Sequence, residues 1–178
     1  IFNYMSRFGF GKKTGIDMEG ETSGLLPSQE WKMKRYQQIW YPGDTVSAGI
    51  GQGYNLVTPL QLAFATATLA NDGVAFQPHL VKEVREAHGP SLPTAGKKLF
   101  DLQLEPAYLR LVKSAMEAVT KPGGTAVVAG YGVPYRLAGK TGTAQVIAIK
   151  QGEKYDAKKV SEYNRDHAWF IAFAPADK

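Results

Sequence analysis

The chain of 178 residues contains no cysteine and only three histidines, His79, His88 and His167. The absence of cysteine excludes thiol nucleophiles, thiolate metal ligands and disulfide bonds. It is compatible with a reducing and with an oxidising compartment. The histidines are far apart in the sequence and form no close pair, so we expect no metal site and no cofactor.

Long apolar runs are missing as well. No stretch of about 18 consecutive apolar residues occurs, so nothing in the chain is expected to span a membrane. The start, IFNYMSRFGF, has neither an initiator methionine nor a signal-peptide pattern, and WFIAFAPADK ends just after an apolar run. We therefore expect an interior piece of a longer chain, with any membrane anchor outside it.

Positive charge is present but dispersed. The net charge is +5, and the lysines and arginines form short clusters, KKTG, KMKR and AKKV, with acidic residues nearby. This pattern favours a solvated basic surface over a nucleic-acid interface. Because 44% of the residues are hydrophobic, the chain has enough apolar material for a core.

The local patterns predict a mixture of helices and strands. Residues 58–73 form the clearest helix, with Thr58 as N-cap, Pro59 at the first position, Gln61 completing a capping box and Gly73 ending it. Further helices are predicted for 28–38 and 105–120, strands for 74–84, 135–149 and 167–175, and loops for 40–55, 85–98 and 150–166. The irregular order favours an α+β domain with an antiparallel sheet.

The second long helix is supported by the spacing of its apolar residues. In 105–120 the apolar residues recur at helical spacing. The residues that recur at this spacing are Tyr108, Val112, Ala115, Met116 and Val119.

The stretch LAGKTGTAQV, residues 137–146, carries most of the functional information. A nucleotide phosphate loop would need glycine at position 134 and a following helix; Pro134 stands there, and strand-like residues flank the stretch. Two interpretations stay open: an ordinary strand with a solvent-facing lysine, or an edge strand that pairs with an extended peptide. In the second, Lys140 and the threonine hydroxyls suit a carboxylate, and a backbone N–H can face an oxyanion.

K-T-G is also a motif of penicillin-binding proteins and serine β-lactamases. AGKTGTAQV resembles its extended form, and FGFGKKTGID, GDTVSAGIGQGYNLVTPLQLA, NDGVAFQPHLV and GGTA resemble segments of the same family in the same order. The chain is most similar to the class B transpeptidases of rod-shape elongation in Gram-negative bacteria. The resemblance implies a penicillin-binding protein/serine β-lactamase-like antiparallel sheet packed with helices.

The resemblance implies a D,D-transpeptidase that cross-links peptidoglycan through a serine acyl-enzyme and is acylated by β-lactams. A β-lactam sensor or a D,D-carboxypeptidase of the same superfamily is the alternative. No serine here has lysine three residues later or asparagine two residues later. Residues 1–178 are therefore expected to be a partial domain, with S-x-x-K and S-x-N upstream of Ile1 and the last strand and helix beyond Lys178. The segment alone is predicted to be inactive.

The same resemblance assigns roles to the matched strand. Lys140 and Thr143 are predicted to be catalytic, and Thr141, Gly142 and Thr143 to bind substrate, with Thr143 as the contacting threonine and Thr141 as support. Gln52, in GIGQG, either lines the active site or only shapes a tight turn.

The resemblance also implies partners and a location. The expected partners are peptidoglycan stem peptides ending in D-Ala-D-Ala, β-lactam antibiotics and a membrane glycosyltransferase, with no nucleic acid. The expected place is the periplasmic face of the inner membrane, with an N-terminal anchoring helix outside this chain.

Overall fold

The computed structural model describes residues 1–85, 89, 91–94, 96–147, 155–156 and 158–177. The helices are α1 (Phe2–Met5), α2 (Gln29–Tyr36), α3 (Pro42–Gly49), α4 (Pro59–Ala70), α5 (Pro106–Val119) and α6 (Val127–Gly130), with 3-10 turns at Ser6–Phe8 and Glu162–Asn164. The strands are β1 (Val74–Phe76), β2 (Glu83–Arg85), β3 (Ser91–Pro93), β4 (Lys98–Asp101), β5 (Ala138–Ala144) and β6 (His167–Phe173). All pairings among them are antiparallel, β1 with β4, β2 with β3 and β5 with β6, which confirms the α+β prediction.

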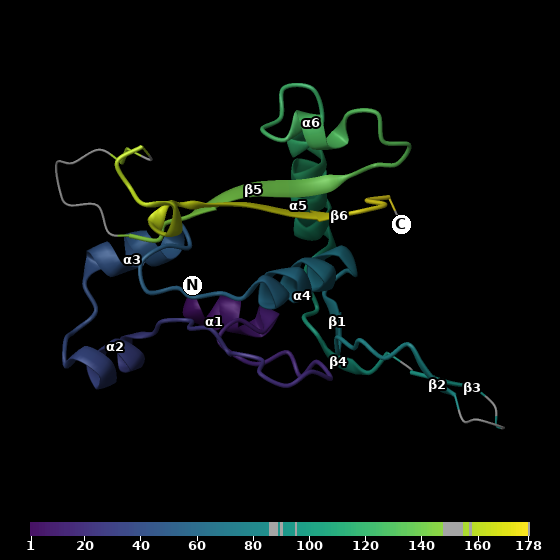
Figure 1. Ribbon diagram of the computed structural model, residues 1–178, viewed down its shortest axis with the longest axis horizontal. Coiled ribbons are helices and arrows are strands. Elements are labelled where there is room, and N and C mark those ends of the chain that lie inside the picture. Colours follow the sequence, from purple (N-terminus) through teal and green to yellow (C-terminus); the bar gives the residue numbers. More distant parts are fainter. Residues whose placement is uncertain (86–88, 90, 95, 148–154, 157, 178) are drawn as a thin grey trace.

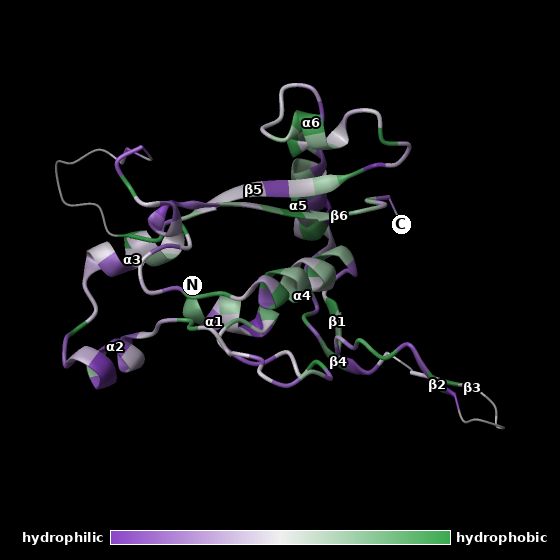
Figure 2. Cartoon of the chain, viewed as in Figure 1, coloured by the Kyte–Doolittle hydropathy of each residue, from purple (hydrophilic) through white to green (hydrophobic). Residues whose placement is uncertain are grey.

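The β5–β6 ribbon is the longest pairing, with Ala138 opposite Phe173 and Ala144 opposite His167. Helix α5 packs against β5 and α4 packs against β6, so the ribbon lies over both helices (Figure 1). Figure 2 shows apolar residues along α4 and β1, which also pack together. The buried apolar residues include Phe64, Ala75, Leu109, Met116 and Ala138.

Helix α4 forms as its sequence predicts. The Thr58 hydroxyl accepts a hydrogen bond from the Gln61 N–H at 3.1 Å, and the Gln61 side chain accepts one from the Thr58 N–H at 3.0 Å. The Gln61 amide also donates to the carbonyls of Lys12 and Ser23, each at 2.7 Å. The capping glutamine thus ties the loop before α2 to the core. Because the Gln61 side chain is buried, its polar atoms need these hydrogen-bond partners.

The other predicted helices are confirmed in extent. Helix α2 is capped by the Ser28 hydroxyl, which accepts from the Trp31 N–H at 3.0 Å. Helix α5 begins at Pro106 and ends at Val119, inside the predicted 105–120.

The buried face of α5 is rotated by about one residue from the apolar pattern of its sequence. Tyr108 is 72% exposed and Val112 is 44% exposed, whereas Leu109, Met116 and Glu117 are buried. The sequence pattern counted only apolar residues. Glu117 can occupy the core side because Arg136 satisfies its carboxylate.

The loop prediction for 40–55 is also wrong in its first half, which forms α3. Pro42 occupies the first turn, where its missing N–H costs nothing. The Asp44 carboxylate accepts from the Tyr41 N–H at 2.7 Å and from the Lys32 ammonium at 2.5 Å. The hydrogen bonds from Lys32 and from Tyr41 lower the pKa of Asp44, and together they start a helix in a glycine-rich stretch.

The predicted strand 74–84 is interrupted, and the predicted loop 85–98 contains β3 and the start of β4. Asp17 explains the interruption, because its carboxylate accepts from the N–H groups of Leu80 (2.6 Å) and Val81 (3.1 Å). Backbone donors bound to a side chain are not available to a strand partner. Parts of the predicted 85–98 and 150–166 loops, and the end of the predicted 135–149 strand, lie outside the described residues.

Candidate active-site strand

Strand β5 pairs with β6 along one edge, and no other strand of the described residues pairs with its second edge. In an antiparallel pair, the backbone groups of alternate residues face the partner strand and those of the intervening residues face away. The carbonyls of Thr141 and Thr143 accept side-chain hydrogen bonds from Lys140 and Gln52, so these two residues direct their backbone groups to the free edge. The Thr143 N–H therefore faces outward, as an oxyanion donor on this strand must.

Lys140 is exposed on β5, and its ammonium group lies 2.6 Å from the Thr141 carbonyl oxygen. No carboxylate of the described part of the chain lies within ion-pair distance of it. An unpaired lysine beside an open strand edge offers a positive charge to an anionic ligand. This geometry fits the predicted role of Lys140, which stays a prediction.

The two threonines of the motif differ in their surroundings. Thr141 is half-buried, and its hydroxyl lies 3.3 Å from the hydroxyl of Thr125 in the turn after α5. Thr143 is exposed. The turn therefore supports Thr141, while Thr143 is open to solvent. The contact role of Thr143 and the support role of Thr141 stay predictions.

The two glycines of β5 differ in how much space a side chain would find at each position. A Cβ on Gly139 would lie 2.6 Å from Cζ of Phe170 and 3.0 Å from the Ile171 carbonyl oxygen, so a side chain there would displace the Phe170 ring and crowd the β6 backbone. A Cβ on Gly142 would meet only Trp169 Cβ at 3.6 Å, an ordinary contact. Gly142 is thus not demanded by packing, which leaves its predicted role in ligand approach open to test.

Gln52 lies against the C-terminal end of β5, although 91 residues separate it from Thr143. Its side-chain amide donates to the Thr143 carbonyl at 2.8 Å, and its side-chain oxygen accepts from the Gln145 N–H at 3.3 Å. The tight turn is present too, since the N–H groups of Gly51 and Gln52 donate to the carbonyls of Ala48 and Ser47. The tight turn is thus present, and the position of Gln52 beside Thr143 is compatible with a role at the active site, which stays a prediction.

The N-terminal end of β5 is held by an ion pair that sequence patterns did not indicate. Arg136 donates three hydrogen bonds to the buried Glu117 carboxylate, at 2.6, 2.8 and 3.1 Å, and Lys121 adds a fourth at 3.2 Å. Burial raises the pKa of Glu117, but the hydrogen bonds from Arg136 and Lys121 outweigh it and leave the pKa below its usual value. The Thr120 hydroxyl donates to the Leu137 carbonyl at 2.6 Å, so α5 fixes where β5 begins.

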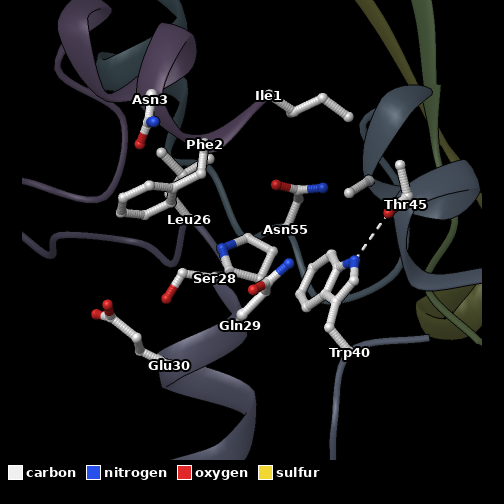
Figure 3. A pocket seen from close by; sticks show the side chains of 12 residues that line it. Ile1, Phe2, Asn3, Leu26, Ser28, Gln29, Glu30, Trp40, Thr45 and Asn55 are labelled. Carbon is white, nitrogen blue, oxygen red and sulfur yellow. Dashed lines mark hydrogen bonds between the residues drawn. The ribbon is translucent and has the colours of Figure 1, made fainter. Parts of the chain in front are cut away.

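A cavity of about 470 Å³ lies elsewhere, between α1, the start of α2 and α3 (Figure 3). Its lining includes Phe2, Glu30, Asn55 and Trp40, whose indole N–H donates to the Thr45 hydroxyl at 2.8 Å. The described lining residues include none of β5. We therefore place the candidate site at the strand edge, where the charge, the hydroxyl and the outward N–H converge, and not at this cavity.

The described residues have neither a cluster of metal ligands nor a membrane-spanning helix. They contain no group of three histidine, cysteine, aspartate or glutamate side chains placed to hold a metal ion. No described helix is long and apolar enough to cross a bilayer. His88 lies outside the described residues.

Comparisons with known proteins give a consistent result. The family model "Penicillin binding protein transpeptidase domain" matches residues 1–178. The Peptidoglycan D,D-transpeptidase MrdA of Escherichia coli K12 is 41% identical over 98% of this chain. The chain spans only 28% of the length of that relative.

Solved structures show the same likeness. Penicillin-binding protein 2 of Pseudomonas aeruginosa, in complex with WCK 5153, is 43% identical, with a TM-score of 0.78 over 99% of this chain and 36% of that one. Penicillin-binding protein 2 of Helicobacter pylori, in complex with MreC, is 33% identical, with a TM-score of 0.75 over 99% of this chain and 29% of that one. The fold and family predicted from the sequence are thereby confirmed: the chain belongs to the penicillin-binding protein transpeptidase domain family.

Proposed function

We propose that this chain is the C-terminal part of a peptidoglycan D,D-transpeptidase that works through a serine acyl-enzyme. The observation that carries the proposal is the free edge of β5, where an outward Thr143 N–H adjoins the exposed Lys140 ammonium. In the reaction a serine hydroxyl attacks the penultimate carbonyl of a D-Ala-D-Ala stem peptide. The bond to the terminal D-Ala breaks, D-Ala leaves with a proton, and an amine of a second stem peptide takes the acyl group and releases the serine.

The chain's own residues have defined tasks in that scheme. Lys140 supplies positive charge for the substrate carboxylate and for proton transfer. The Thr143 hydroxyl binds the carboxylate, and the Thr143 N–H supplies one donor of the oxyanion hole, which stabilises charge that develops only in the transition state. Gly142 lets the peptide approach the strand, and Thr141 supports Thr143 from its contact with Thr125.

The nucleophile belongs to the part of the protein that precedes Ile1 in this proposal. No serine of the chain stands in S-x-x-K or S-x-N, and the relatives are more than three times as long as this segment. The last strand and helix of the domain lie beyond Lys178. The segment alone is therefore inactive.

The proposed partners follow the family. They are peptidoglycan stem peptides, β-lactams and a membrane glycosyltransferase, and the H. pylori relative was solved with MreC. We propose that the protein is located at the periplasmic face of the inner membrane and is anchored there by an N-terminal helix outside this chain.

Labelling with a fluorescent penicillin tests the proposal. The full-length protein is expected to be labelled covalently, and excess unlabelled penicillin is expected to prevent the labelling. The 178-residue segment is expected to stay unlabelled. Failure to label the full-length protein contradicts the proposed function, and labelling of the segment contradicts the placement of the nucleophile.

A product assay separates the transpeptidase from its alternatives. With a D-Ala-D-Ala stem peptide and an amine acceptor, a transpeptidase forms the cross-linked product and releases D-Ala. A D,D-carboxypeptidase releases D-Ala and forms the hydrolysed peptide only. A β-lactam sensor is acylated by penicillin but turns over neither peptide.

A further inference from the structure

The carboxamide of Gln52 forms hydrogen bonds with the backbone at the end of β5, as a neighbouring strand would. Its N–H donates to the Thr143 carbonyl and its oxygen accepts from the Gln145 N–H. These two groups are one acceptor and one donor on the same edge of a strand, two residues apart, which is the pairing unit of a β-ladder. A single side chain therefore occupies the edge of β5 just beyond Thr143.

The turn that carries Gln52 is itself well held. The Gln52 N–H donates to the Ser47 carbonyl at 2.9 Å, and its carbonyl accepts from the Asn55 side-chain amide at 2.8 Å. Gly51 and Gly53 adopt left-handed backbone angles, with φ of 77° and 72°, a conformation that glycine adopts without strain. Because the backbone on both sides of Gln52 is fixed, its side chain reaches β5 from a defined point.

The support extends to α3, which directly precedes the turn. Asp44 at the start of α3 pairs with Lys32, whose side chain is only 2% exposed and whose ammonium lies 4.5 Å from the centre of the Tyr41 ring. Figure 1 shows α3 at the end of the ribbon opposite α6. A buried ion pair thus anchors the helix from which the Gln52 turn is built.

We propose that Gln52 is a positioning residue that sets the orientation of the Thr143 backbone, and through it the oxyanion donor. Thr143 directs its N–H and its carbonyl to the same edge, so a hydrogen bond to the carbonyl holds the residue in the orientation in which its N–H faces the ligand. This rests on the proposed function. Gln52 acts on the reaction through Thr143 and makes no contact with the reacting atoms.

The test measures acylation of the full-length protein by a chromogenic cephalosporin in single-turnover experiments. Gln52→Met keeps the length of the side chain and removes both hydrogen bonds. We expect the acylation rate constant to fall about 10-fold, less than the loss of a whole oxyanion donor would cost. The dissociation constant of the complex before acylation is expected to change by less than about 2-fold, because the positioning matters only when charge develops on the carbonyl.

Gln52→Glu separates the two hydrogen bonds. A carboxylate still accepts from the Gln145 N–H but cannot donate to the Thr143 carbonyl. We expect at least as large a fall in the rate constant as in Gln52→Met. Gln38→Met, the same exchange at an exposed glutamine outside the site, is the matched control and should acylate at the wild-type rate.

A spectroscopic readout identifies the mechanism. In the acyl-enzyme the ester carbonyl sits in the oxyanion hole, and a weaker hydrogen bond to it raises its infrared stretching frequency. We expect the frequency to rise in Gln52→Met and Gln52→Glu and to stay unchanged in Gln38→Met. Circular dichroism and the melting temperature verify that each variant is folded.

The outcomes are distinguishable. A wild-type rate constant and ester frequency in both Gln52 variants, with normal labelling of the wild type, overturn this inference alone. A change confined to the dissociation constant also overturns it, because Gln52 would then be a ligand-contacting wall. Absence of labelling in the wild type overturns the proposed function and this inference together.

Discussion

The two ends of β5 are held in opposite ways. At the N-terminal end Ala138 is fully buried, and the buried Glu117 binds Arg136 and Lys121. At the C-terminal end Thr143 is exposed and is held by the neutral side-chain amide of Gln52. Burial and an ion pair hold the N-terminal end. Hydrogen bonds orient the C-terminal end and leave it exposed to solvent.

The difference has an energetic meaning. Hydrogen bonds to buried charged groups contribute about 1.5–3 kcal/mol, and exposed neutral ones contribute about 0.5–1.5 kcal/mol. Substitutions at the N-terminal end should therefore lower the free energy of unfolding. Substitutions at the C-terminal end should change the reaction more than the stability.

The largest effect is expected from Lys140→Ala in the full-length protein. The change removes a fixed charge from a preorganised site, so acylation by fluorescent penicillin should slow by about 100-fold or more. Because Lys140 is exposed, the melting temperature should hardly change. Lys34→Ala, at an exposed lysine of α2, is the control and should acylate normally. An unchanged rate in folded Lys140→Ala would make the lysine a solubilising residue only.

The paired variants Gly139→Ala and Gly142→Ala compare the two ends within one motif. Gly139→Ala forces a Cβ against the Phe170 ring, and overpacking of this kind costs about 1–3 kcal/mol. Gly142→Ala makes only an ordinary contact with Trp169, so it should leave the melting temperature nearly unchanged. Thermal unfolding of both variants measures the contrast, and equal destabilisation would contradict the view that the ends differ.

The smallest effect is expected from Glu117→Gln. Removing the charged acceptor should lower the free energy of unfolding by about 1–2 kcal/mol at pH 7, a value reduced because Arg136 is half exposed. Against the effect of burial, the hydrogen bonds from Arg136 and Lys121 hold the pKa of Glu117 in the folded state below its ordinary value of 4.5. Its stabilisation is thus complete above that value and is lost as the pH falls through the folded pKa.

The pH dependence provides the check on Glu117. Denaturant unfolding at pH 7 and at pH values below about 4.5 measures the free energy of unfolding of the wild type and of Glu117→Gln. The difference between these two free energies should shrink as the pH falls. Glu162→Gln, at an exposed carboxylate near the chain's end, should differ little from the wild type throughout. If the difference in free energy of unfolding between wild type and Glu117→Gln stays constant with pH, the ion pair does not hold α5 to β5.

Local signals predicted the elements that local interactions form. The capping box of Thr58 and Gln61 marked α4 correctly because its donor and acceptor are three residues apart. The extent of α5 was predicted, but its buried face was not, because Glu117 is stabilised there by Arg136, 19 residues further along the chain. Helix α3 was missed because the glycines of 40–55 favoured a loop, although Pro42 and the hydrogen bond from the Tyr41 N–H to Asp44 mark its start locally. The ion pair of Asp44 with Lys32 of α2 is the part that only the tertiary structure supplies.

The sequence by itself predicted a strand in 135–149, of which 138–144 forms β5. It excluded a phosphate loop because Pro134 cannot supply the required N–H, and it identified the family through the K-T-G motif and the segments that accompany it. Tertiary structure decided which edge of that strand is open and what holds its two ends. The contacts of Gln52 with Thr143 and of Gly139 with Phe170 join residues far apart in the chain. No local periodicity encodes such contacts, since they exist only once α3, α5 and β6 have packed around β5.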